Sequence, residues 1–182
     1  MECEVSPQDI DETANPGESP RDLVCRLAEG KARSCLAQQD GDNVVALGSD
    51  TVVVYEDRIM GQPRDREDAL SMLQALSGVK HRVLTAVTLA SRDKVESRLS
   101  STEVCFRVIE KKEIEAYWET GEPLGKAGAY AIQGMAAVFV QSISGSYSGV
   151  MGLPLFETAE LLTEFGLPCW QPATEVTEIK DE

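Results

Sequence analysis

The apolar and polar positions of this chain alternate with a period of two in some stretches and near 3.6 in others. Short runs rich in Val, Ile and Leu, bounded by polar or glycine residues, are typical of buried β-strands. Strands are expected at residues 44–47, 52–55, 58–60, 83–90, 103–109 and 136–143. Val104, Phe106 and Val108 alternate with Cys105 and Arg107, so the fourth and fifth of these strands should form a long hairpin.

Four other stretches carry apolar side chains at helical spacing. They lie at residues 20–37, 65–77, 110–120 and 155–165. The first has Ser19 as its N-cap, Pro20 at its first position and Asp22 three residues after the cap, which is a favourable helix start. A glycine follows each of the other three and favours a helix end. Because helices and strands are intermixed, we expect an α/β protein with a mixed sheet rather than a purely parallel one.

Length and composition are those of a globular protein with one domain. The chain has 182 residues, of which 42% are apolar and 26% charged. A chain of this length buries about two-thirds of the surface that it exposes when unfolded. The apolar patterning ends near residue 168. We therefore expect a single domain over residues 1–168 and an acidic, disordered tail over residues 169–182.

Charge and cysteine content exclude several function classes. The net charge of −14 argues against an extended surface for polymeric nucleic acid, but not against a small phosphorylated substrate. No apolar run approaches the roughly twenty residues that span a bilayer, and the acidic N-terminus does not resemble a signal peptide. The five cysteines are scattered without a CxxC pair, which is typical of reduced thiols. We expect a cytoplasmic protein with no membrane partner.

The candidate chemistry centres on Asp50, which lies between two predicted strands. Aspartate is unfavourable beside buried strands unless its carboxylate is satisfied. The segment Gly48-Ser49-Asp50-Thr51 is therefore expected to interrupt the strands and to present a carboxylate and a hydroxyl group. A plain polar turn is the alternative, since turns favour the same residue types. The single histidine, His81, is expected to make a structural hydrogen bond rather than to act in acid–base catalysis.

Several short motifs follow one another along most of the chain. They are Gly48-Ser49-Asp50-Thr51, Pro63-Arg64-Asp65, Leu76-Ser77-Gly78 with His81, Val83 and Thr85, Lys126-Ala127-Gly128-Ala129-Tyr130, Ile132-Gln133-Gly134, Gly145-Ser146-Tyr147, and Val150 with Gly152-Leu153-Pro154-Leu155, Glu157 and Thr158. In this order, over roughly residues 5–166, they resemble the Maf family of nucleoside triphosphate pyrophosphatases. The first and fifth motifs are similar to the branch of that family that acts on dTTP and UTP.

The resemblance implies a two-lobed fold, similar to that of inosine triphosphatases, around a mixed and strongly twisted sheet with a central cleft. It also implies hydrolysis of a nucleoside triphosphate to the monophosphate and pyrophosphate, with Mg²⁺ or Mn²⁺. Asp50 matches the family's proton acceptor and is also a candidate metal ligand. Glu12 matches a second family carboxylate that could share the metal, although taken alone it is more simply a solvated loop acid.

Phosphate and base recognition fall on other side chains. The candidates to hold phosphate are Lys31, Arg64 and Lys126, although Lys31 taken alone reads as a solvated helix residue. Uracil and thymine present carbonyl–NH–carbonyl edges, which the amide of Gln133 complements with one donor and one acceptor. In the family, the positions that match Thr51 and Gln133 are linked to substrate choice. Taken alone, Gln133 would be a surface amide.

Two departures from the family pattern concern positive charge. The family's leading strand and Ser-Pro-Arg-Arg turn have no counterpart before residues 1–4, which themselves read as the family's second strand. We interpret the chain as an N-terminally shortened member. Gln62 stands where the family usually has Lys. Both changes remove cations that would face a triphosphate, so weak substrate binding is expected.

Two functions follow from these observations. The first is an enzyme that hydrolyses dTTP, UTP and modified pyrimidine nucleotides. The second is a catalytically weakened nucleotide-binding protein that acts in septum formation, the role after which Maf proteins are named. A homodimer is implied by the resemblance alone. Phosphate release from UTP in the presence of Mn²⁺ distinguishes the two functions.

Overall fold

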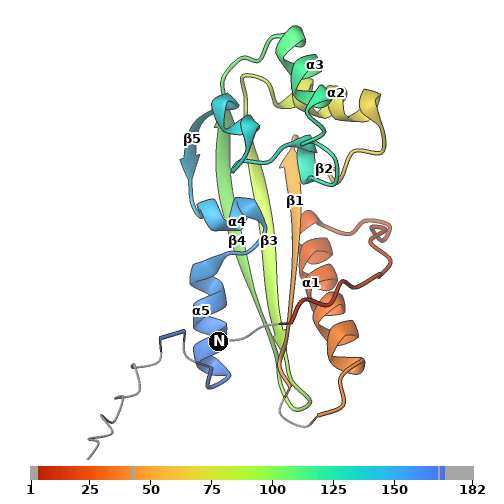
Figure 1. The fold of residues 1–182 in the computed structure, drawn as a ribbon, viewed down its shortest axis with the longest axis vertical. Helices are drawn as coiled ribbons and strands as arrows, with labels where there is room; N and C mark the ends of the chain where they lie inside the picture. Colours follow the sequence, from red (N-terminus) through yellow and green to blue (C-terminus); the bar gives the residue numbers. More distant parts are fainter. Residues whose placement is uncertain (1–3, 42–43, 168, 171–182) are drawn as a thin grey trace, which may run out of the picture.

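The structure is a computed structural model that describes residues 4–41, 44–167 and 169–170. It is a two-lobed α/β protein in which long strands run through both lobes (Figure 1). In chain order the elements are α1 (Pro20–Ala37), β1 (Ala46–Tyr55), β2 (Arg58–Met60), α2 (Arg66–Leu76), β3 (Lys80–Ala90), β4 (Val95–Phe106), α3 (Lys111–Glu119), η1 (Ala127–Ala129), η2 (Met135–Phe139), β5 (Val140–Ser144), α4 (Tyr147–Met151) and α5 (Leu155–Glu164).

Within the described residues the strands form one sheet in the order β2-β1-β3-β4-β5. Every neighbouring pair is antiparallel, so the mixed arrangement that was expected is not seen among these strands. The long hairpin is confirmed: β3 pairs with β4 from Lys80 opposite Cys105 to Ala90 opposite Val95. Tight connections explain two of these pairings, because β1–β2 and β3–β4 are joined without a crossover helix.

The interruption expected at residues 48–51 is wrong, because β1 continues through it. Gly48, Ser49 and Asp50 pair with residues of β3 like the rest of the strand. The Asp50 carboxylate is satisfied by a side chain of α1, as described below, and the backbone has no need to open.

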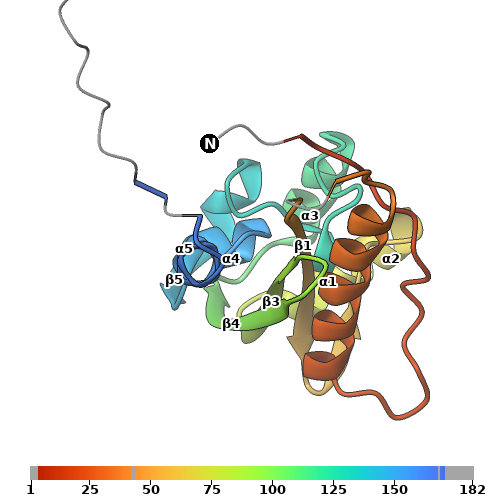
Figure 2. The same cartoon turned by 90° about the horizontal axis from the view of Figure 1, so that it is seen from below.

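Three apolar clusters hold the sheet to its helices. The largest fills the upper lobe, where α2, α3, η1 and η2 meet the upper ends of the strands. The second lies between α1 and the sheet and contains Leu27, Val52 and Leu84. The third includes Val87, Leu89 and Leu161 of α5. Figure 2 shows α1 on one side of the sheet and α5 on the other, so the lower lobe has two covered faces.

The four expected helices are confirmed within two residues at each end. The strand expected at residues 136–143 is partly wrong, since η2 occupies its first half and β5 begins at Val140. The strand expected at residues 1–4 is not seen at Glu4, and residues 1–3 lie outside the described residues. Residues 171–182 of the expected tail also lie outside them, so the boundary at residue 168 stays a prediction. In the part of the chain that the structure describes, no helix is long and apolar enough to cross a membrane.

Candidate active site

A cavity of about 540 Å³ lies between the two lobes and collects most of the predicted site residues. Its walls come from the segment before α1, from α1, from β1, from the loop after β2, and from residues 125–133 and 150–152. The lining includes Glu12, Lys31, Asp50, Thr51, Gln62, Lys126, Tyr130, Gln133 and Met151. A volume of this size is typical of small-molecule sites and suits a nucleotide.

Asp50 is the buried acid of this cavity. Its side chain is only 9% exposed, and its Oδ1 accepts a hydrogen bond of 2.6 Å from the Lys31 ammonium. The same ammonium lies 2.8 Å from Oε1 of Glu12, which is half exposed on the segment before α1. Two carboxylates therefore converge on one cationic group. The structure brings together the predicted base, the predicted second carboxylate and one predicted cation.

Gly48 explains how α1 comes close enough to make this contact. Gly48 and Asp50 lie two residues apart on β1, so both face α1. A Cβ atom at Gly48 would collide with the backbone carbonyl of Ala28 and the backbone nitrogen of Ala32. The absence of a side chain lets α1 lie directly on the strand, which places Lys31 over Asp50.

Burial and pairing act in opposite directions on the two charged groups. Burial raises the pKa of Asp50 above its ordinary value, although the hydrogen bond and charge of Lys31 oppose this shift. Burial lowers the pKa of Lys31, but its bonds to Asp50 and Glu12 outweigh that effect and the net shift is upward. The proton therefore stays on Lys31, and Asp50 is a carboxylate that is more basic than usual.

Ser49 and Thr51 point to the other face of β1 and connect it to α4. The Ser49 hydroxyl donates to the backbone carbonyl of Gly152 at 2.7 Å. The Thr51 hydroxyl is 2.9 Å from that of Thr85, which donates to the carbonyl of Gly149 at 2.7 Å. Thr51 thus lines the cavity, and its hydroxyl is already part of a chain of hydrogen bonds.

Lys126 lines the same cavity as Asp50, on a segment whose backbone bonds to the loop after β2. Gly128, two residues later, donates its N–H to the carbonyl of Gly61 at 3.0 Å. Gly128 has φ of +66°, and an added Cβ atom would press on the side chain of Val53. The Lys126 ammonium is exposed and makes no hydrogen bond or ion pair with the described residues, so it is available to an anion.

Gln133 lines the cavity from a turn of the upper lobe. The turn is closed by a hydrogen bond of 3.0 Å from the N–H of Gly134 to the carbonyl of Ala131. Ile132 is buried in the upper cluster, whereas the Gln133 side chain is exposed toward the cavity. The amide is therefore presented to the cavity.

Arg64 does not line this cavity. Its side chain is 83% exposed and pairs with Asp68 at 3.0 Å, one helical turn away. It borders a separate hollow of about 280 Å³ that shares Ile59, Gly61 and Gln62 with the cavity. The structure therefore separates Arg64 from the other phosphate-binding candidates, because the nearby acid of α2 holds it.

Tyr130 also lines the cavity, although the sequence pattern does not predict it as a site residue. Its ring is buried, and its hydroxyl is 2.9 Å from Nε2 of His81. The structural hydrogen bond predicted for His81 is thus confirmed. The only signal in the sequence was the membership of both residues in the family motifs, which does not reveal their contact.

The chain is similar in sequence to known proteins over most of its length. A family model described as Maf-like protein matches residues 1–165. The chain is similar to the dTTP/UTP pyrophosphatase of Alkalilimnicola ehrlichii, with 54% identity over 160 residues, 86% of this chain and 79% of that protein. It is 52% identical to the dTTP/UTP pyrophosphatase of Pseudoalteromonas atlantica over 161 residues, 87% of this chain and 84% of that protein. These similarities show that the chain belongs to the Maf family.

Proposed function

We propose that this protein hydrolyses dTTP and UTP, and modified pyrimidine nucleotides like them, to the nucleoside monophosphate and pyrophosphate. The observation that carries the proposal is the buried Asp50 carboxylate in a cavity of nucleotide size that Lys126 and Gln133 also line. Similarity to relatives named dTTP/UTP pyrophosphatase supports the same substrate class.

The proposed reaction uses Asp50 as the general base. Asp50 accepts a proton from a water molecule as the water oxygen bonds to the α-phosphorus. The bond between that phosphorus and the α–β bridging oxygen breaks, and pyrophosphate leaves with the bonding electrons. The pKa of Asp50, which burial raises, makes the carboxylate a stronger base, while Lys31 fixes its orientation.

Charge on the substrate is neutralised by cations of the cavity wall. Lys126 supplies a free ammonium, and Lys31 has a third N–H beyond those that meet Glu12 and Asp50. Arg64 could bind phosphate only if its ion pair with Asp68 breaks.

A divalent cation fits the same donor set. In the described residues no group of three or more His, Cys, Asp or Glu side chains could hold a metal ion alone. Glu12 and Asp50 nevertheless converge on one cationic group, and Mg²⁺ or Mn²⁺ commonly binds through one or two carboxylates together with substrate phosphates. These two residues would hold the ion, which when bound would supply further neutralisation of phosphate charge.

Two substitutions test the proposal on UTP, dTTP, CTP and GTP. Asp50→Asn removes the proton acceptor, so pyrophosphate release should fall by ~10²–10⁴-fold on every nucleotide. Gln133→Leu should weaken UTP and dTTP selectively, since an unpaired base edge costs about 1–3 kcal/mol. Asp93→Asn, in the exposed turn after β3, is the matched control and should behave as wild type.

Several results would contradict this function. They are a wild-type protein without pyrophosphate release, an Asp50→Asn variant with more than a tenth of the wild-type rate, or an equal loss on all nucleotides in Gln133→Leu. The first result would favour the alternative, nucleotide binding without turnover in septum formation. A homodimer and a cytoplasmic location are further parts of the proposal, and light scattering on the purified protein tests the first of these.

A further inference from the structure

Tyr117 and Glu122 lie at the end of α3, where they meet the backbone on either side of Gln133. The Glu122 carboxylate accepts hydrogen bonds from the N–H groups of Met135 and Ala136, at 2.9 and 3.2 Å. It also accepts a bond of 2.7 Å from the Tyr117 hydroxyl. That hydroxyl in turn accepts a bond of 3.2 Å from the N–H of Ala131. One carboxylate and one phenol therefore bind the chain both before and after the Gln133 turn.

These contacts stand in for a helix cap. The N–H groups of Met135 and Ala136 belong to the first turn of η2 and have no partner within it. Burial raises the pKa of Glu122, but the N–H groups and the Tyr117 hydroxyl outweigh that effect and the net shift is downward. The carboxylate is thus held ionised where it accepts three hydrogen bonds.

The local packing leaves little room for other arrangements. Tyr117 is 4% exposed, and its ring meets that of Phe139 edge to face at 5.3 Å. A Cβ atom on Gly134 would overlap the Glu122 carboxylate, so the glycine of this turn is needed for the contact. The Glu122 carboxylate therefore occupies the space that a side chain at position 134 would need.

We propose that Glu122 and Tyr117 are positioning residues for base selection: they fix the turn of residues 131–134 and thereby the direction of the Gln133 amide. The inference rests on the proposed function, in which Gln133 reads the pyrimidine edge. A hydrogen-bonding pair tolerates only a small displacement, so a turn that shifts by about 1 Å loses discrimination before it loses the fold.

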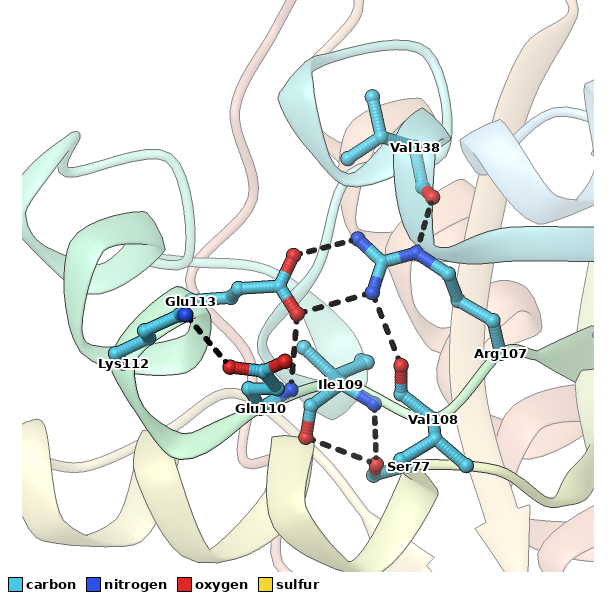
Figure 3. Close-up of polar contacts among 8 residues, drawn as sticks. All are labelled: Ser77, Arg107, Val108, Ile109, Glu110, Lys112, Glu113 and Val138. Carbon is cyan, nitrogen blue, oxygen red and sulfur yellow. Dashed lines mark hydrogen bonds and ion pairs between the residues drawn. The ribbon is translucent and has the colours of Figure 1, made fainter.

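The other end of η2 provides a matched control. Arg107 donates from Nε to the carbonyl of Val138 at 2.9 Å and forms two bonds with the Glu113 carboxylate (Figure 3). This cluster ties η2 to β4 and α3, but it lies beyond the residues that carry Gln133. Glu113→Gln makes the same chemical change as Glu122→Gln at a site that does not hold the turn.

The experiment compares wild type with Glu122→Gln, Tyr117→Phe, Gly134→Ala and Glu113→Gln. The first readout is the ratio of kcat/KM for UTP to that for GTP. Both nucleotides carry the same phosphates, so this ratio cancels any effect of the Glu122 charge on Lys126. We expect the ratio to fall roughly tenfold in the first three variants, as for a lost hydrogen bond, and to stay at the wild-type value in Glu113→Gln.

The second readout is amide hydrogen exchange of residues 131–136, which does not depend on turnover. Exchange should accelerate at least tenfold in Glu122→Gln and Tyr117→Phe and stay slow in Glu113→Gln. The inference is overturned if Glu122→Gln and Tyr117→Phe keep either the wild-type ratio or the wild-type exchange. A wild-type protein that releases no pyrophosphate from UTP would instead overturn the proposed function, and the exchange data would still show whether the two residues hold the turn.

Discussion

Gln62 is the cavity residue at which a single substitution should most improve substrate binding. It is exposed in the cavity wall and lies close to Gly125, the residue before Lys126 in the chain. Gln62→Lys would add a second cation facing the phosphates, worth about 1 kcal/mol or roughly fivefold at an exposed position. We expect KM for UTP to fall by that factor at low salt while kcat changes little, and the gain to shrink as salt is added.

The control for this substitution is Gln74→Lys, which adds the same charge on the exposed side of α2. Equal effects of the two variants on KM would mean that net charge, rather than a local phosphate contact, controls binding. An unchanged KM in Gln62→Lys alone would place the phosphates elsewhere in the cavity.

For single residues, the sequence predicted which functional groups line the cavity better than it predicted which side chains pair with each other. Asp50, Lys126 and Gln133 reach one cavity, because the motifs that contain them carry the right functional groups. The pairing of Lys31 with Asp50 spans nineteen residues and left no signal in the pattern. For Arg64, the motif predicted a phosphate-binding role. The structure instead pairs it with Asp68, an acid only four residues away in the sequence.

The hairpin between β1 and β2 is an element that can be made more stable. Its two central residues, Glu56 and Asp57, have φ of +47° and +61°, and Tyr55 pairs with Arg58 across them. Such two-residue turns favour Asn-Gly, and side chains other than Asn, Asp or Gly pay about 1 kcal/mol there. The double substitution Glu56→Asn with Asp57→Gly should raise Tm by about 2–4 °C.

Thermal unfolding followed by circular dichroism measures this effect. Glu56→Ala is the control, because it removes the charge but keeps a side chain that disfavours positive φ. A rise in Tm in that variant equal to the rise in the double variant would attribute the gain to charge rather than to backbone conformation.

Elements were predictable where local pattern alone determines them. All four helices carry apolar side chains at helical spacing, three of them begin with a side-chain cap or a capping box, and all four were found. The sequence failed at β1 and at η2, where partners distant in the chain decide the backbone. Lys31 satisfies Asp50, so β1 continues, and Glu122 accepts the first N–H groups of η2 where a strand was expected.

For the whole molecule, the buried histidine should make stability depend on pH. His81 is 3% exposed, its Nδ1 has no hydrogen-bond partner among the described residues, and burial lowers its pKa to about 4. The unfolded chain, with a pKa near 6.5, binds the proton first. Stability is therefore complete above about pH 6.5 and falls progressively toward pH 4, by up to roughly 3 kcal/mol.

Urea unfolding of wild type and His81→Gln at pH 7.5, 6 and 5 measures this dependence. The variant keeps a neutral polar side chain but cannot titrate, so its free energy of unfolding should change less over this range. The difference between the two proteins cancels the titration of the carboxyl groups. Parallel pH curves would mean that His81 is protonated without cost in the folded protein.

The strand β3 contributes to all three apolar clusters, through Val83 in the upper lobe and through Leu84 and Val87 in the lower one. The lobes are consequently joined by continuous pleated backbone rather than by a flexible linker. Moving the two lobes apart would require the sheet itself to bend, and hydrogen-bonded strands resist large bending. We therefore expect nucleotide entry and pyrophosphate release to depend on movement of the loops at the rim of the cavity rather than on separation of the lobes.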